Sequence, residues 1–109
     1  MTPEKKKMTL EEEFHQGCLD GYEAAKKELG YNATYFLRMI SENGGVLAAK
    51  RILNSKDIPE GLMRLWEHGR LDMSLENYVL NPRYRSLFTP EELKIARQRL
   101  EKLDYKPTW

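Results

Sequence analysis

FTPEELKIARQRLEKL, residues 88–103, is the stretch of sequence that decides the fold class. It opens with a threonine whose hydroxyl can accept a backbone N–H, a proline suited to a first helical turn, and a glutamate three residues after the threonine. Apolar side chains then recur at steps of three or four residues, the period of one helix face; they are Leu93, Ala96, Leu100 and Leu103. The segment therefore predicts an amphipathic helix with a solvated outer face.

A second strong helix signal lies near the other end of the chain, in residues 9–30 (TLEEEFHQGCLDGYEAAKKELG). Thr9 and Glu12 have the spacing of a capping box, and Gly30 is a typical helix stop. Apolar residues recur at helical spacing between them: Leu10, Phe14, Cys18, Tyr22, Ala25 and Leu29. We therefore predict a helix of about five turns.

Glycine and proline divide the residues between these two helices into short segments. Four helices are expected there: residues 33–43 with Asn32 as the cap and Gly44 as the stop, residues 46–53, a helix that starts at Pro59 and stops at Gly69, and one that Ser74 caps and Asn81-Pro82 ends. No segment alternates apolar and polar residues as strands do. The predicted fold is all-α, a compact orthogonal cluster of about six or seven short helices. Its expected core includes Phe14, Phe36, Leu65, Trp66 and Leu93.

Length and composition indicate one domain in a reducing compartment. The chain has 109 residues, enough for one hydrophobic core. Its 18 basic and 17 acidic side chains give a formal charge of +1, which draws in neither nucleic acid nor a membrane surface. Cys18 is the only cysteine, so no disulfide can form within the chain. We expect residues 1–8 to be a disordered tail, residues 9–105 a single helical domain and residues 106–109 a C-terminal tail.

Targeting signals are not expected either. No apolar run approaches the roughly 20 residues that cross a bilayer. The lysines at positions 5–7 are followed by glutamates instead of the apolar core of an export signal. We therefore predict a cytoplasmic protein without membrane contact.

The block from Tyr35 to Leu100 has a pattern of its own. Its elements are Phe36 to Ile40, the Gly44-Gly45 elbow with Ala48 and Ala49, Leu65-Trp66-Glu67-His68-Gly69-Arg70-Leu71-Asp72, and Leu87-Phe88 with Glu91-Glu92. The block resembles a small helical domain of bacterial and phage proteins, found alone or beside other domains. This resemblance implies an all-helical fold and implies no activity, substrate or catalytic residue. The first thirty residues lie outside it.

Candidate catalytic and metal-binding residues are few. His15 and Cys18, three residues apart on a helix, could share a metal or act as base and nucleophile, but the further ligands or orienting groups are missing. Glu67, His68, Arg70 and Asp72 form the densest ionisable cluster. We interpret these residues as ion pairs or caps that stabilise the turn around Gly69. A small enzyme centred on His68 is an alternative. The expectation is no metal, no cofactor and no catalysis.

Two glycines four residues apart, Gly17 and Gly21, favour close approach by a neighbouring helix. We assign that contact to the inside of the domain. A homodimer seam is the alternative.

Aromatic and guanidinium side chains indicate a partner-binding surface, because such residues anchor interfaces. The candidates are Tyr78, Arg83, Tyr84, Arg85 and the terminal Trp109, which must either fold back onto the domain or enter a pocket of a partner. The sequence therefore predicts a non-catalytic protein-interaction domain, an accessory or inhibitory factor of a bacterial or phage system. Nucleic-acid binding by the arginines and tyrosines is the first alternative.

Overall fold

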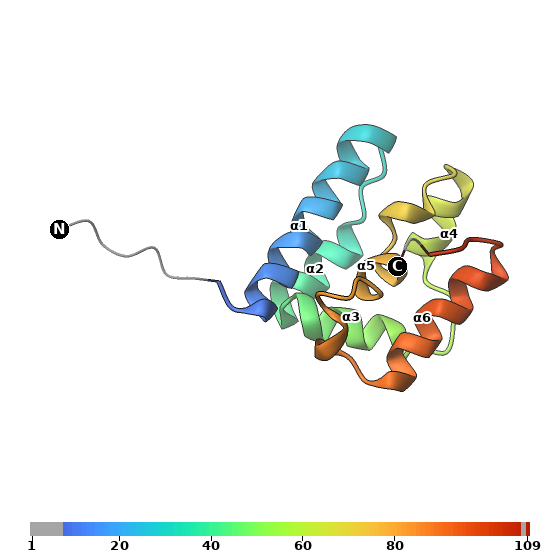
Figure 1. Ribbon diagram of the computed structural model, residues 1–109. Helices are drawn as coiled ribbons and strands as arrows, with labels where there is room; N and C mark the ends of the chain where they lie inside the picture. The colour runs from blue at the N-terminus through green and yellow to red at the C-terminus, as the bar shows by residue number, and fades with distance from the viewer. Residues whose placement is uncertain (1–7, 108) are drawn as a thin grey trace.

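The computed structural model describes residues 8–107 and 109, and these residues form an all-α fold (Figure 1). The six α-helices in the described residues are α1 Leu10–Leu29, α2 Thr34–Asn43, α3 Gly45–Leu53, α4 Glu60–Glu67, α5 Leu75–Val79 and α6 Pro90–Lys102. Two single 3₁₀ turns join them, η1 Leu71–Met73 and η2 Arg85–Leu87. The predicted fold class is confirmed. The predicted disordered tail lies outside the described residues except for Met8.

The two helix starts that the sequence marks most strongly are present. In α1, the hydroxyl of Thr9 accepts the N–H of Glu12 at 3.1 Å, and the Glu12 carboxylate accepts the N–H of Thr9 at 3.0 Å. Thr89 and Glu92 make the same reciprocal pair at the start of α6. Both capping boxes satisfy N–H groups that a helix start leaves free.

The central helix is α3, which packs against α1, α2, α5 and α6. Ala48 and Ala49 are fully buried, and their small side chains let neighbouring helices approach. A Cβ atom on Gly45 would stand 2.7 Å from the Cα of His15, so glycine is required there. The imidazole Nδ1 of His15 accepts the N–H of Gly45 at 2.9 Å and thereby caps the start of α3.

Two sequence predictions about the helices are wrong. Asn32 does not cap α2, because its side-chain oxygen accepts the hydroxyl of Tyr22 instead, and the cap position is Ala33 without a side-chain hydrogen bond. Trp66 is not in the core: it is 47% exposed on α4, because Leu62 and Leu65 alone cover the inner face of this short helix.

The core forms around residues from both ends of the chain. Phe14 of α1, Leu53 of α3 and Leu100 of α6 are all fully buried in one apolar cluster. Of the expected core residues, Phe14 and Leu65 are buried, while Phe36 and Leu93 are only partly covered.

No helix in the described residues is long and apolar enough to span a lipid bilayer.

Candidate functional site

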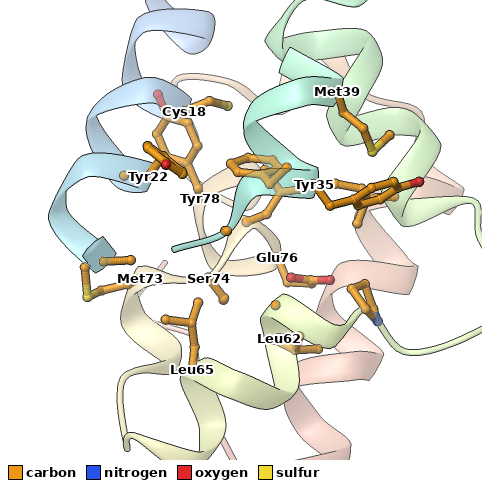
Figure 2. A pocket seen from close by; sticks show the side chains of 18 of the residues that line it. Cys18, Tyr22, Tyr35, Met39, Leu62, Leu65, Met73, Ser74, Glu76 and Tyr78 are labelled. Atoms are coloured by element: carbon orange, nitrogen blue, oxygen red, sulfur yellow. The ribbon is translucent and has the colours of Figure 1, made fainter. Parts of the chain in front are cut away.

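An open cleft of about 990 Å³ separates α1 and α2 from α4, η1 and the start of α5. Figure 2 shows Tyr22 and Met39 from α1 and α2 on one side, and Leu62 and Leu65 from α4 on the other. Most of the side chains that line it are apolar or aromatic. Its size is at the upper end of the range for ligand pockets.

Two exposed side chains of the cleft are aromatic, beside charged ones such as Arg38, Glu42 and Arg51. Tyr35 of α2 is 71% exposed and Trp109 is 44% exposed, and both line the cleft. Met39 and Met73 beside them are partly buried. Methionine side chains are flexible and polarisable, so such walls adapt to the shape of what they hold.

The buried polar side chains of the cleft come from the first turn of α5 and its cap. Ser74, Glu76 and Asn77 are each less than a tenth exposed. The hydroxyl of Ser74 accepts the N–H of Asn77 at 3.1 Å and caps the helix, as predicted. The side-chain oxygen of Asn77 has no hydrogen-bond partner, and no other buried side-chain atom of the described residues shares that condition. An unmatched buried acceptor is costly, so this end of the cleft favours a bound hydrogen-bond donor.

Glu76 is held by an arginine from α6. Nη1 of Arg99 donates to its carboxylate at 3.2 Å, and Figure 2 shows Glu76 between the α2 and α4 walls. Burial raises the pKa of Glu76, and the charge of Arg99 acts in the opposite direction. Arg99 also donates to the backbone oxygens of Ile52 and Leu53, the last two residues of α3, and of Ser55 just after it. The pair is therefore part of the framework of the cleft.

The thiol that lines the cleft, Cys18, is not activated. Cys18 is 3% exposed, and burial raises the pKa of its thiol to about 12, so it stays protonated near neutral pH. No histidine is among the described residues that line the cleft. A cysteine nucleophile with a histidine base is thus not assembled there.

His15 and Cys18, the pair considered as metal ligands or as base and nucleophile, each have another role. Nδ1 of His15 is occupied by the N–H of Gly45, and Cys18 is buried in the core. Within the described part of the chain, no three His, Cys, Asp or Glu residues are placed to hold a metal ion.

The ionisable cluster around Gly69 is a turn. Gly69 has a left-handed backbone with φ of 67°, and the Arg70 Nε donates to the Asp72 carboxylate at 3.1 Å. His68 ends α4, is exposed and does not line the cleft. The arginine–aspartate contact ties the turn, as the sequence interpretation proposed.

The structure places the predicted partner-binding residues in two different settings. The ring of Tyr78 stacks on Phe14 at 4.7 Å, and Tyr84 meets the same ring edge-on at 5.4 Å. The hydroxyl of Tyr84 donates to Glu13 at 2.8 Å, and Arg83 donates to the same carboxylate through two nitrogens. These two tyrosines therefore pack within the domain, and do not form an exposed stacking platform for nucleic-acid bases.

The other two predicted residues, Arg85 and Trp109, donate to backbone oxygens of α5 and its end. Nε of Arg85 donates to the backbone oxygen of Leu80 at 2.7 Å. Trp109 folds back onto the domain, where its indole N–H donates to the backbone oxygen of Asn77 at 2.8 Å. Only Trp109 and Tyr78, of the five, line the cleft. A partner surface built from all five stays a prediction.

Sequence reasoning missed the cleft. Tyr35 and Met39 are four residues apart and share one face of α2. This spacing was visible in the sequence and could have indicated one wall of the cleft. The opposite wall, with Met73 and the α5 start, becomes adjacent only through packing.

Comparisons with protein-family models, with curated proteins and with solved structures found no match. The resemblance of residues 35–100 to a bacterial and phage helical domain therefore stays a prediction.

Proposed function

We propose that this chain is a non-catalytic protein-interaction domain, an accessory or inhibitory factor of a larger bacterial or phage system, and that it holds an apolar segment of its partner in the cleft. The observation that carries the proposal is the 990 Å³ cleft with apolar walls and two exposed aromatic residues, Tyr35 and Trp109. Aromatic side chains at the edge of an apolar groove are typical anchors of protein interfaces. The bacterial or phage setting is supported by the sequence resemblance alone.

The cleft favours a protein segment over a metabolite. A metabolite site combines an apolar pocket with several polar groups that fix the orientation of the ligand. Here the carboxylate of Glu76 is engaged by Arg99, and the hydroxyl of Ser74 caps α5. Charged lining residues such as Arg38, Glu42 and Arg51 are exposed. Walls that combine many apolar side chains with exposed charged ones suit an amphipathic helix or an extended chain that inserts a row of apolar side chains.

Gly21 offers a test that leaves the fold intact. It lines the cleft on α1, and a Cβ atom added there would meet nothing within 4 Å. Gly21→Gln should therefore place a side chain in the cleft without disturbing the core, and Gly21→Ala is the matched control with the same backbone change. Met39→Glu, which puts a charge on α2, the other helix of the same wall, is an independent blocking variant.

Affinity capture from a lysate of the source organism, followed by quantitative mass spectrometry, measures the effect. Partners of the cleft should be retained by Gly21→Ala and by Gln98→Glu on the exposed face of α6, and lost at least tenfold with Gly21→Gln and Met39→Glu. Thermal melts establish that all four variants fold. Equal capture by blocked and control variants would rule out the cleft as the interaction site.

A further inference from the structure

We infer that the cleft contains a binding site for an indole, that Trp109 occupies it within the chain, and that the partner segment carries a tryptophan that takes its place. This inference rests on the proposed function and names the side chain that the cleft recognises. The indole site is defined here as the backbone oxygen of Asn77 with the adjoining cleft wall.

The path of the chain after α6 is built to return toward the cleft. Asp104 adopts a left-handed backbone with φ of 57°, the only described non-glycine residue that does so. The N–H groups of Leu103 and Tyr105 donate to the backbone oxygen of Leu100 at 3.0 and 2.9 Å and close the helix end. Figure 1 shows the chain running back from the end of α6 toward α5.

The contact of Trp109 is specific in its chemistry. Its Nε1 donates to the Asn77 oxygen at 2.8 Å, which is good geometry for a hydrogen bond. The same oxygen accepts the N–H of Leu80 at only 3.3 Å, so the indole provides its shorter contact. The hydrogen bond requires a donor on an aromatic ring, a combination that tryptophan provides and phenylalanine does not.

The contact of Trp109 is also easily reversed. The indole remains 44% exposed, and its recorded polar contact is one hydrogen bond. Tyr105 packs partly against the core, while Lys106 after it is exposed, so release of Trp109 requires movement only of the chain after Tyr105. The cleft is also much larger than one indole, and the buried acceptor of Asn77 is still unmatched with Trp109 in place. An incoming tryptophan would need to replace only the hydrogen bond from Trp109 to the backbone oxygen of Asn77, while the rest of its segment occupies the cleft.

Indole itself is the probe for this site. Binding of indole and of 1-methylindole, which lacks the N–H, would be measured by amide NMR of ¹⁵N-labelled full-length protein. Three forms are compared: the wild type, Trp109→Ala, and Trp109→Phe, which keeps a ring without a donor. We expect indole to shift the amides of Met73 and Asn77 in Trp109→Ala and to bind the wild type at least fivefold more weakly, because Trp109 competes.

The two controls report on the hydrogen bond. 1-Methylindole should bind Trp109→Ala about fivefold more weakly than indole, since one hydrogen bond contributes on that order. Trp109→Phe should bind indole with an affinity between those of the wild type and Trp109→Ala. Amide spectra without ligand show whether each variant is folded.

Three results would overturn the inference: no indole binding to folded Trp109→Ala, equal indole affinity of Trp109→Ala and the wild type, or equal binding of indole and 1-methylindole. These results leave the proposed function separately testable. If Gly21→Gln abolishes partner capture but indole does not bind Trp109→Ala, the cleft binds its partner through a side chain other than tryptophan. If indole binds as expected but the blocked and control variants capture the same proteins, the indole site exists and the proposed protein-interaction function of the cleft is wrong.

Discussion

Gly17 and Gly21 lie one turn apart on α1, and their surroundings differ. A Cβ atom on Gly17 would stand 1.8 Å from the hydroxyl oxygen of Tyr78, whereas one on Gly21 would meet nothing. Close approach to Gly17 is therefore real and intramolecular, as the sequence suggested. The approaching group is a tyrosine ring, and Gly21 takes no part.

This difference predicts opposite effects of alanine at the two positions. Gly17→Ala must push Tyr78 off its stack on Phe14, which should lower the free energy of unfolding by about 1–3 kcal/mol. Gly21→Ala should raise it by up to about 1 kcal/mol, because alanine is the better helix former. Urea denaturation measures both. A Gly17→Ala protein as stable as the wild type would contradict the packing of Tyr78.

At the scale of elements, polar contacts tie α3 to α6 at two points. Near the start of α6, Lys50 and Asn54 donate to the carboxylate of Glu92 at 2.8 and 2.9 Å. One turn before its end, Arg99 donates to the carbonyl groups that α3 leaves free, and to Glu76. Arg99 thus caps the end of one helix from the side of another.

Two substitutions of Arg99 should separate its charge from its geometry. Arg99→Met leaves Glu76 buried and unpaired, and should lower the free energy of unfolding by roughly 3–5 kcal/mol. Arg99→Lys keeps the charge but cannot reach several carbonyl oxygens and a carboxylate at once, so the loss should be smaller, about 1–3 kcal/mol. Chemical denaturation of the two variants provides the comparison. Equal stability of the two variants would show that the retained charge contributes nothing, whereas an Arg99→Lys protein as stable as the wild type would show that only the ion pair matters.

At the scale of the whole molecule, Glu13 connects α1 to the segment after α5, seventy residues later in the chain. Hydrogen bonds from Arg83 and Tyr84 lower the pKa of Glu13 to about 2, from 4.5. A carboxylate with a lowered folded-state pKa stabilises the fold above its unfolded pKa, and that contribution disappears as the pH falls toward 2.

The melting temperature should therefore show a Glu13-dependent fall in acid. Glu13→Gln removes the ionised group, so the wild type should melt higher than Glu13→Gln at pH 6, and the difference should shrink between pH 4.5 and pH 2.5. Other carboxylates titrate in both proteins and cancel in this comparison. A difference that is constant from pH 6 to pH 2.5 would mean that the contact does not depend on the charge of Glu13.

The sequence by itself determined the helices and their starts, because capping boxes, glycine stops and apolar periodicity involve residues only three or four apart. Thr9 with Glu12 and Thr89 with Glu92 satisfy each other locally, whatever the rest of the chain does. Asn32 shows the limit of such reasoning: its side chain turned to Tyr22, a competitor ten residues away.

Only the tertiary structure decided the cleft, the enclosure of Tyr78 and Tyr84, and the return of Trp109 to Asn77. These contacts join residues 32 to 71 positions apart. Their geometry depends on how whole helices are placed relative to one another. Side-chain volumes at α3 and α6 determine that placement, and the local periodicity of the sequence carries no information about it. The candidate site is a product of packing, and for that reason its two walls could not be matched from the sequence.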